Sequence, residues 1–390
     1  MTNNIWWDDL QIHMVEWRRH LHRNPEVSFH EEKSSSFVAD MLESFGVEVK
    51  RHVGGHGVIG TIRGDKPGPV VMLRADMDAL PIQDEKDVEY ASQKAGAMHA
   101  CGHDGHVSIL LGTALYFSKH KADIQGEIRF LFQPAEELLP GGAVKVIADG
   151  ALEGVDVIYG IHLWTPLPVG VAASKEGPLM AAADDFYIEI KGKGGHGGMP
   201  QSTVDSLVAG SALVMQLQTV VSRSVDPLRP AVLTIGTMQA GSAQNVIAES
   251  CKMSGTVRTF DEETRADMKD RVHRIVSQTG GAYGAQTEVN YIMGYPPVVN
   301  DKQETDRFFR QAVQVFGDEQ VHTSPMLMPA EDFAYYLQQV PGCFMFVGAG
   351  NPDKGAIYPH HHPKFDFDED AMQHAVKLFI AMATDYMGGQ

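Results

Sequence analysis

The stretch Val70–Pro81 reads VVMLRADMDALP, an apolar run of strand length that leads directly into two aspartates. Other short apolar runs are found at Val58–Ile62, Ile128–Phe132 and Val157–Ile161. Helical patterns such as His106–Lys119 lie between these runs along the chain. Strands that alternate with helices form parallel sheets with helices on their faces. The order therefore predicts an α/β domain with a mostly parallel sheet covered by helices.

A second set of elements begins after Trp164. The pattern predicts helices at 203–221 and 262–280, and strands at 182–191, 231–238, 248–260 and 287–293. The order strand–helix–strand–strand–helix–strand is the split βαβ pattern of ferredoxin-like domains. We therefore expect residues 182–294 to be an inserted α+β domain, with the α/β domain divided between residues 1–181 and 295–390.

The composition narrows the class of protein. The 390 residues include 32 Lys and Arg against 50 Asp and Glu, a net charge of −18. This balance argues against a nucleic-acid-binding protein and against docking on an anionic membrane, since both need a cationic face. No apolar stretch reaches the roughly 20 residues of a membrane span, and the start MTNNIWWDDL does not resemble a signal peptide. Three cysteines make no disulfide framework, so we expect a cytoplasmic protein.

Acids and imidazoles follow three of the predicted strands. Asp76 and Asp78 come after the first, Glu136 and Glu137 after the second, and His162 after the third. In sheets of this kind the ligand site lies at the carboxyl ends of the strands. Side chains of these types at one edge predict a metal site there.

The segment Met98–His106 reads MHACGHDGH. Cys101 and His103 are two residues apart, so on a loop both side chains can reach one cation or a close pair. Thiolate and imidazole suit zinc and other late first-row metals. A Gly-broken turn with polar side chains is the ordinary alternative, but His99 and His106 add further imidazoles and favour a metal site.

Two more motifs point to the same chemistry. In extended backbone the side chains of Glu136 and Glu137 point opposite ways, so one carboxylate can hold a metal while the other acts as general base toward water. The run YPHHHPKFDFDED contains His360–His362, and its internal position makes a tag unlikely to explain it. One or two of these histidines can reach the same metal.

Several motifs together resemble one known family. They are LRADMDALP, HACGHDGH, QPAEE, GIHLW, GKGGHGGMP, GTVRTF, PAEDFAYY and HHHPKFDFDE, in that order along nearly the whole chain. The sequence is similar to the metal-dependent amidohydrolases that include N-acyl-amino-acid deacylases, hippurate hydrolase and indole-acetyl-amino-acid hydrolases, within a larger group of dinuclear-metal exopeptidases. The resemblance implies a zinc-exopeptidase-like catalytic domain with an inserted lid or dimerisation domain.

The resemblance also implies roles for individual residues. Two divalent metals, zinc first and otherwise manganese, cobalt or nickel, would be held by Cys101, His103, Glu137, His162 and His361. The last of these is selected by counting back from Pro363. Glu136 would be the general base and acid, and Asp78 the acid that orients the metal site. Asp76 has no assigned role.

The predicted insert carries its own candidates by the same resemblance. His196 would polarise the scissile carbonyl, in some relatives from the partner subunit, and Asn245 and Arg258 would bind the carboxylate of the amino-acid product. The planar guanidinium of Arg matches a carboxylate with two hydrogen bonds. The insert resembles one that pairs subunits, so we expect a homodimer, with a tetramer as the alternative.

The predicted function is hydrolysis of the amide bond of N-acyl-amino acids, small-molecule substrates, to a carboxylic acid and a free amino acid. A dipeptidase or carboxypeptidase of the same mechanism is the first alternative. A non-catalytic metal-binding protein is the second, but it leaves the adjacent Glu136 and Glu137 unexplained. An NAD-dependent dehydrogenase is disfavoured, because no G-x-G-x-x-G motif follows the early strands.

Overall fold

The computed structural model describes residues 2–388 and divides into two compact units. The first unit comprises Met1–Gly177, Val299–Pro325 and Asp332–Gln390, and the second comprises Pro178–Val298 and Met326–Glu331. The short segment Met326–Glu331 belongs to the second unit because Leu327 exchanges backbone hydrogen bonds with Leu179 and Ala181. The sequence pattern placed the borders of the insert at 182 and 294 and did not detect this return of the chain.

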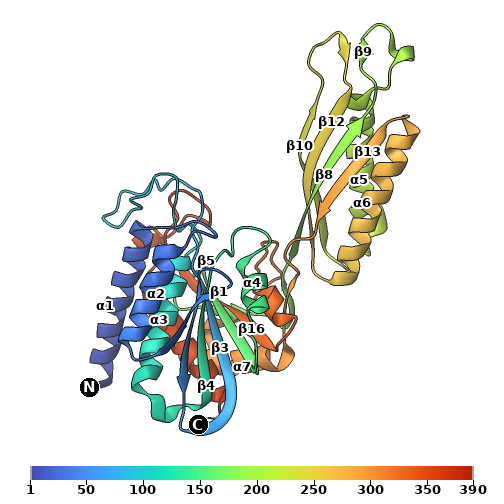
Figure 1. Cartoon of the computed structure of the whole chain (residues 1–390). Coiled ribbons are helices and arrows are strands. Elements are labelled where there is room, and N and C mark those ends of the chain that lie inside the picture. Colours follow the sequence, from blue (N-terminus) through green and yellow to red (C-terminus); the bar gives the residue numbers. More distant parts are fainter. Residues whose placement is uncertain (1, 389–390) are drawn as a thin grey trace. The chain divides into compact units, whose positions relative to one another are not determined.

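The first unit is built on a sheet of eight strands (Figure 1). Their order in the sheet is β1 (Glu48–Val53), β2 (Gly57–Arg63), β4 (Gln125–Gln133), β3 (Lys66–Asp76), β5 (Val157–Pro168), β16 (Gly342–Gly350), β6 (Ala172–Ser174) and β15 (Val321–Thr323). The central strands β4, β3, β5 and β16 are parallel to one another, whereas β2 and β6 run antiparallel to β4 and β16. The carboxyl ends of the central strands therefore meet at one edge of the sheet.

Helices cover both faces of this sheet, since every residue of β16 and the first seven of β5 are buried. The helices of the unit are α1 (Thr2–Arg23), α2 (Glu32–Ser44), α3 (His103–Lys119), α4 (Gly142–Ala148), α7 (Lys302–Phe316), α8 (Ala334–Leu337) and α9 (Asp370–Tyr386), with 3-10 turns at Lys121–Asp123, Asp318–Gln320 and Pro352–Lys354. Among residues 2–388, no helix is both long enough and apolar enough to cross a membrane.

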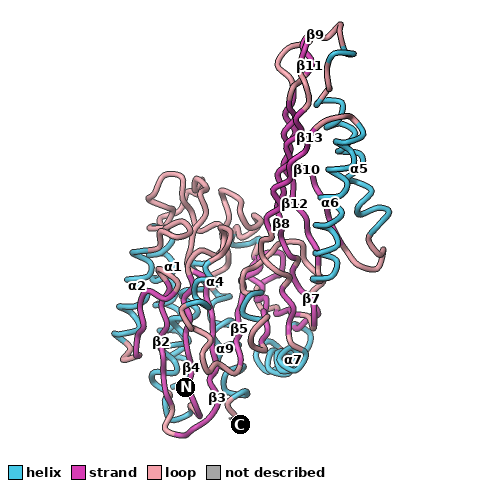
Figure 2. Tube along the Cα trace, turned by 45° about the vertical axis from the view of Figure 1, so that its right-hand side comes forward, coloured by secondary structure: helices cyan, strands magenta, loops and turns pink. Residues whose placement is uncertain are grey.

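The second unit has the predicted split βαβ order. It contains β8 (Ala182–Lys191), β9 (Gly195–His196), a 3-10 turn (Pro200–Ser202), α5 (Ser206–Ser224), β10 (Ala231–Ala240), β11 (Val246–Ile247), β12 (Ser250–Thr259), α6 (Glu262–Ala282) and β13 (Gln286–Ile292). Strands β10, β12, β8 and β13 form an antiparallel sheet in that order, and both helices lie on one side of it (Figure 2).

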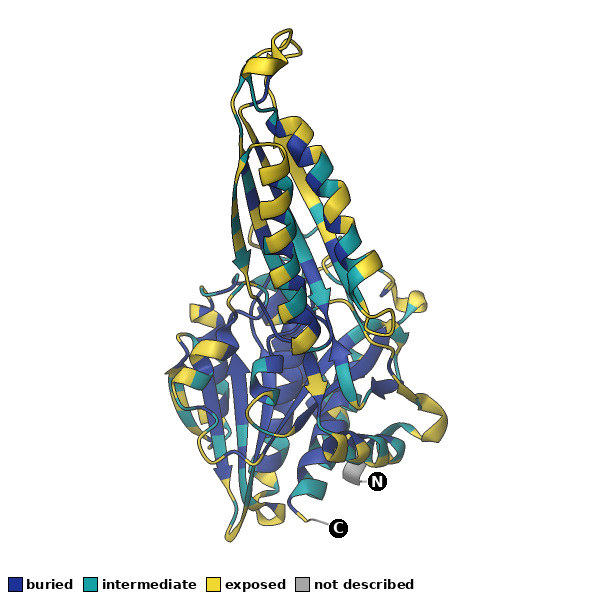
Figure 3. Cartoon of the chain, turned by 90° about the vertical axis from the view of Figure 1, so that its right-hand side faces the viewer, coloured by how far each residue is buried: buried dark blue, intermediate teal, exposed yellow. Residues whose placement is uncertain are grey.

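Burial explains why the second unit has this arrangement. Along β8, buried residues alternate with more exposed ones, as expected for a sheet with one covered face. The buried side chains pack against the inner faces of α5 and α6, whose outer faces are exposed (Figure 3). Short strands β7 (Gly177–Met180) and β14 (Val298–Asn300) lie where the chain passes between the units.

Candidate functional site

The five predicted metal ligands gather in the first unit. The ligand atoms of Cys101, His103 and His162 lie within 4.8 Å of one another, and so do those of Cys101, Glu137 and His361. We call these five residues the ligand cluster. They come from the segment before α3, the first residue of α3, the loop after β4, strand β5 and the loop before α9. The sheet brings them together although up to 260 residues separate them in sequence.

The ligand cluster contains buried polar atoms that have no hydrogen-bond partner among the described residues. They are Nε2 of His103 and Oε1 of Glu137, which are 3.8 Å apart. Nε2 of His361 lies 3.3 Å from the same Glu137 oxygen, and Nε2 of His162 lies 3.5 Å from Sγ of Cys101. Buried polar atoms without partners are costly. Sulfur, imidazole and carboxylate atoms that face one another in this way fit divalent cations.

The other ring nitrogen of each buried histidine is already engaged. Nδ1 of His103 lies 2.9 Å from the carbonyl oxygen of Asp78 and 3.3 Å from its Oδ1, while Nδ1 of His162 donates to the carbonyl of Leu163 at 2.7 Å. These bonds place the proton on Nδ1 and leave Nε2 as the free donor atom for a metal. The carbonyl and the carboxylate of Asp78 thus both orient the ring of His103.

Neighbouring charges shift the pKa values of His103 and Asp78. Burial alone would lower the pKa of His103, but the carboxylates of Asp76 and Asp78 raise it to about 10. Burial alone would raise the pKa of Asp78, but His103 and the hydroxyl of Ser28 lower it. Because a metal binds the neutral imidazole, metal binding is expected to weaken in acid.

Glu136 lies beside the ligand cluster and is 6% exposed. A carboxylate oxygen of Glu136 lies within 4.8 Å of the ligand atoms of His103 and Glu137. The expectation of extended backbone here is wrong. Ala135 has a φ of +54°, and residues 136–138 form a bend. The turn directs both carboxylates toward His103, which alternation along a strand cannot do.

Asp76 and His106 pair with each other beside the ligand cluster. Nδ1 of His106 lies 2.6 Å from Asp76, and Nε2 accepts a hydrogen bond from the backbone of Leu163 at 2.9 Å. Both ring nitrogens of His106 therefore have protein partners. Arg74 donates to the other oxygen of Asp76 at 2.6 Å and to Asp332 at 2.9 Å.

The three consecutive histidines, His360–His362, have different surroundings. His361 alone reaches the ligand cluster, and it has a φ of +65° with its backbone N–H donating to Ala100 at 2.8 Å. His360 is half-buried, with its ring against Trp164, Phe365 and His162, and His362 stacks on Tyr358. A non-glycine residue in this backbone region marks local strain, which is common at functional sites.

The start of α3 differs from the prediction. The helical pattern predicted a start near His106 and a loop at His103, whereas the helix begins at His103. Apolar periodicity missed the first turn because His103, Asp104 and His106 are polar yet fully buried, each with a charged or polar partner.

Asp104 belongs to a cluster that sequence reasoning missed. Arg18 is completely buried and donates to Asp104 at 2.9 Å, to Asp366 at 2.6 Å and to Glu369 at 3.1 Å. Nδ1 of His22 lies 2.7 Å from Asp104. We call these five residues the ion-pair cluster. Burial alone would raise the pKa of Asp104, but Arg18 and His22 hold it well below its usual range. No local pattern marks Arg18 or His22, since their charged partners are at least 62 residues away.

The predicted residues of the second unit fall in two places. His196 on β9 pairs with Val246 on β11, and the N–H of Gly197 donates to the carbonyl of Asn245 at 2.7 Å, so His196 and Asn245 are neighbours. His196 is exposed. Arg258 pairs with Ala183 near the start of β8, whereas His196 follows the other end of β8 at Lys191, eight residues or about 26 Å further along at 3.3 Å per residue. One copy of this unit therefore does not bring Arg258 to His196.

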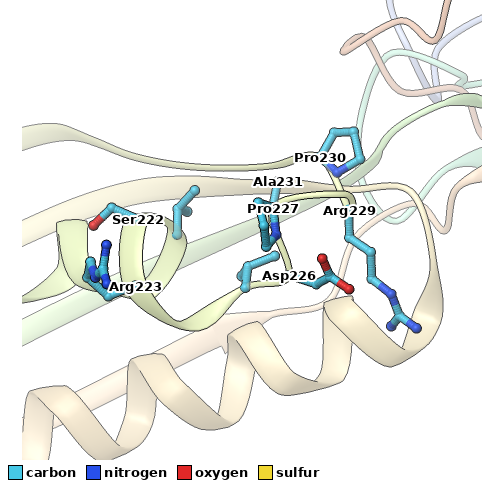
Figure 4. A pocket seen from close by; sticks show the side chains of 9 residues that line it. Ser222, Arg223, Asp226, Pro227, Arg229, Pro230 and Ala231 are labelled. Atoms are coloured by element: carbon cyan, nitrogen blue, oxygen red, sulfur yellow. The ribbon is translucent and has the colours of Figure 1, made fainter.

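Arg258 is partly buried. Its guanidinium donates to the hydroxyl of Thr256 and, at 3.2 Å, to the carbonyl of Val257, and burial lowers its pKa. A surface cavity of about 540 Å³ in the second unit lies elsewhere, after α5, lined by residues such as Arg223, Asp226 and Arg229 (Figure 4). No predicted site residue lines it.

Comparison with known proteins agrees with this geometry. Residues 72–385 match the model of the peptidase family M20/M25/M40. An N-acyl-L-amino acid amidohydrolase of Geobacillus stearothermophilus is 50% identical over 75% of this chain and 79% of its own length. Thermostable carboxypeptidase 2 of Saccharolobus solfataricus is 43% identical over 94% of this chain and 93% of its own.

A solved structure extends the comparison to the fold. A dinuclear metal binding peptidase of Bacillus subtilis superposes with a TM-score of 0.85 at 35% identity, covering 98% of this chain and 100% of its own. The fold class, the family and the assignment as a hydrolase of amide bonds, all predicted from the sequence, are confirmed. The chain belongs to the peptidase family M20/M25/M40.

Proposed function

We propose that this protein hydrolyses the amide bond of N-acyl-amino acids, with Glu136 as the general base and acid. The observation that carries the proposal is the ligand cluster, whose unpartnered buried atoms lie beside the carboxylate of Glu136. The relatives named as an N-acyl-L-amino acid amidohydrolase and a dinuclear metal binding peptidase support the substrate class and the need for two metals.

Cys101, His103, Glu137, His162 and His361 would hold two divalent metals, with zinc expected first and manganese, cobalt or nickel as alternatives. Divalent metals bound in such a site lower the pKa of water and polarise the substrate carbonyl. Asp78 keeps Nε2 of His103 directed at the site by accepting from Nδ1.

Glu136 accepts a proton from water as the water oxygen attacks the amide carbonyl carbon. It then returns this proton to the leaving nitrogen as the C–N bond breaks. The products are a carboxylic acid and a free amino acid, so the atoms of the amide and one water are accounted for. His196 would polarise the carbonyl oxygen, and Asn245 and Arg258 would bind the substrate carboxylate.

Because His196 and Arg258 lie apart in one chain, the proposal includes a homodimer in which the second unit serves as lid and pairing domain, with a tetramer as the other assembly. Whether His196 acts in its own subunit or in the partner is then an experimental question. Mixing inactive Glu136→Gln and His196→Ala subunits distinguishes the two. Regained activity in the mixed dimer supports a contribution from the partner.

The primary experiment compares acetyl-, benzoyl- and indole-acetyl-amino acids with dipeptides, with and without a chelator. We expect Glu136→Ala to lower kcat by about 10²- to 10⁴-fold while the bound metal per chain stays unchanged. Substantial activity in this variant would contradict the role of Glu136, and equal activity after exhaustive chelation would contradict the role of the metals. Preference for peptides would favour a carboxypeptidase, the activity named for the relative from Saccharolobus solfataricus.

A further inference from the structure

The segment between α1 and α2, residues 24–31, lies against the loops that carry the proposed site. The backbone N–H of Ala79 donates to the carbonyl of Glu26 at 2.8 Å, and Val27 forms a β-bridge with Ala79. The hydroxyl of Ser28 donates to Oδ2 of Asp78 at 2.7 Å. This segment therefore touches the residues that follow β3.

The last residue of the segment, Glu31, reaches the loop after β4. Its Oε1 accepts hydrogen bonds from the backbone N–H groups of Ala135 at 2.7 Å and Phe29 at 3.0 Å. Both donors have positive φ, +54° for Ala135 and +67° for Phe29. A non-glycine residue in this region costs about 1–3 kcal/mol and persists only when its surroundings hold it there. One carboxylate oxygen thus holds two strained turns.

Glu31 is available for this contact because another acid caps the helix. It occupies the N-cap position of α2, where short polar side chains such as Asp or Ser usually accept from the first turn, and its longer side chain makes no such bond. Oε2 of Glu26 accepts instead from the N–H groups of Lys33 and Ser34, each at 2.8 Å. The carboxylate of Glu31 is therefore not required by the helix.

Burying the carboxylate of Glu31 costs free energy of folding, so its position needs an explanation. The residue is fully buried, and its Oε2 has no hydrogen-bond partner among the described residues. Burial raises its pKa to about 7, and the charge of Asp78 adds to this effect. Ala135, which it holds, directly precedes Glu136, and the carbonyl of Ala135 is held on its other side by the N–H of Gly142 at 2.7 Å.

We infer that Glu31 is a positioning residue, which sets the direction of the Glu136 and Glu137 carboxylates by holding the backbone of Ala135 in its left-handed turn. This inference rests on the proposed role of Glu136. The positioning role requires an acceptor oxygen at the position of Glu31 and does not require its negative charge. A substitution that keeps the oxygen should therefore have a smaller effect than one that removes it.

The test compares Glu31→Gln with Glu31→Leu in the full-length, metal-loaded protein. Gln retains an oxygen that can accept from Ala135, whereas Leu has a similar volume and no acceptor. Because misplacing a reacting group by about 1 Å can cost 10²-fold, we expect Glu31→Leu to lower kcat and kcat/KM by about 100-fold, and Glu31→Gln by less than about threefold. Glu32→Gln, at the exposed neighbouring position, is the control and should behave as the wild type.

A second readout does not depend on activity. Hydrogen exchange of the peptide that covers residues 133–138 should be faster in Glu31→Leu than in wild type. Wild-type kcat in Glu31→Leu, or an equal loss in both Glu31 variants, would overturn the inference. So would a loss of activity that disappears when rates are expressed per folded molecule. Failure of the proposed role of Glu136 is seen separately, as activity that survives in Glu136→Ala.

Discussion

His103 and Asp104 are adjacent in the first turn of α3, yet they belong to two clusters of opposite character. His103 belongs to the ligand cluster, in which buried atoms lack partners. Asp104 belongs to the ion-pair cluster, in which Arg18 alone donates to three carboxylates. A buried polar group without a partner reduces stability until something binds it, whereas a buried ion pair loses most stability when one of its partners is removed. The two clusters should therefore respond oppositely to mutation, the first in function and the second in stability.

The largest effect is expected from His103→Ala, which removes a donor atom from the ligand cluster. Since metals supply several kcal/mol of transition-state stabilisation, we expect activity to fall about 10³-fold or more, together with bound metal per chain. Elemental analysis and kcat/KM measure the two quantities. A variant with full metal content and full activity would contradict the assignment of His103 as a metal ligand.

The corresponding change in the ion-pair cluster is Arg18→Met. It removes the guanidinium that pairs with the buried Asp104 and the half-buried Asp366 and leaves them only His22 and Lys86 as basic partners, so the free energy of unfolding of the metal-free protein should fall by about 3 kcal/mol. Urea unfolding measures this change. The control is Arg19→Met, because Arg19 also pairs with Glu369 but is 36% exposed, and its loss should cost less than about 1 kcal/mol. Equal effects of the two variants would show that burial does not distinguish them.

A smaller effect is expected from Asp78→Asn, which weakens the support of His103 without removing a ligand. Changes of this kind typically cost 10- to 100-fold in metal affinity, so we expect a shift of about that size in a competition titration against a chelator. Because the amide cannot stabilise the protonated ring as a carboxylate does, the pKa of His103 should also fall. Unchanged affinity would mean that the carbonyl of Asp78, at 2.9 Å from Nδ1, is sufficient to orient the ring.

The smallest effect concerns Asp84, which accepts from the backbone of Ser92 at 2.9 Å and lies 3.3 Å from His22 of the ion-pair cluster. Burial alone would raise its pKa, but these contacts lower it to about 2. A carboxylate with a lowered pKa stabilises the fold above its unfolded pKa of 3.8, and this contribution is lost as the pH falls through about 2. Asp84→Asn should thus cost about 1 kcal/mol at pH 7 and at pH 5, and less near pH 3. A difference from wild type that grows in acid would contradict this prediction.

Much of the fold was predictable because burial imposes a local pattern. The central strands read as continuous apolar runs, since both faces of the sheet are covered, and the antiparallel sheet of the second unit reads as alternation along β8. Edge strands such as β1 and β15 were missed. They are short and half exposed, so their sequences carry little apolar signal.

The ligand cluster was predictable in part for a different reason. Thiol, imidazole and carboxylate groups at strand ends are chemically conspicuous, and a resemblance in motifs selected among them. The groups that support them are not conspicuous. Glu31 and Arg18 have no local signature, because each acts on a loop or helix about 85 to 350 residues away in sequence.

The sequence by itself determined the α/β class, the split βαβ insert, the family and the set of metal-ligand types, because these depend on periodicity and on the chemistry of residues near one another in the chain. The tertiary structure alone decided which of those groups meet. It separated His103 from His106 by the hydrogen bonds that each ring makes, brought His361 within reach of Cys101 and Glu137, and turned Glu136 through the positive φ of Ala135. Distance, burial and hydrogen-bond satisfaction are properties of contacts across the fold, and no local pattern of residues encodes them.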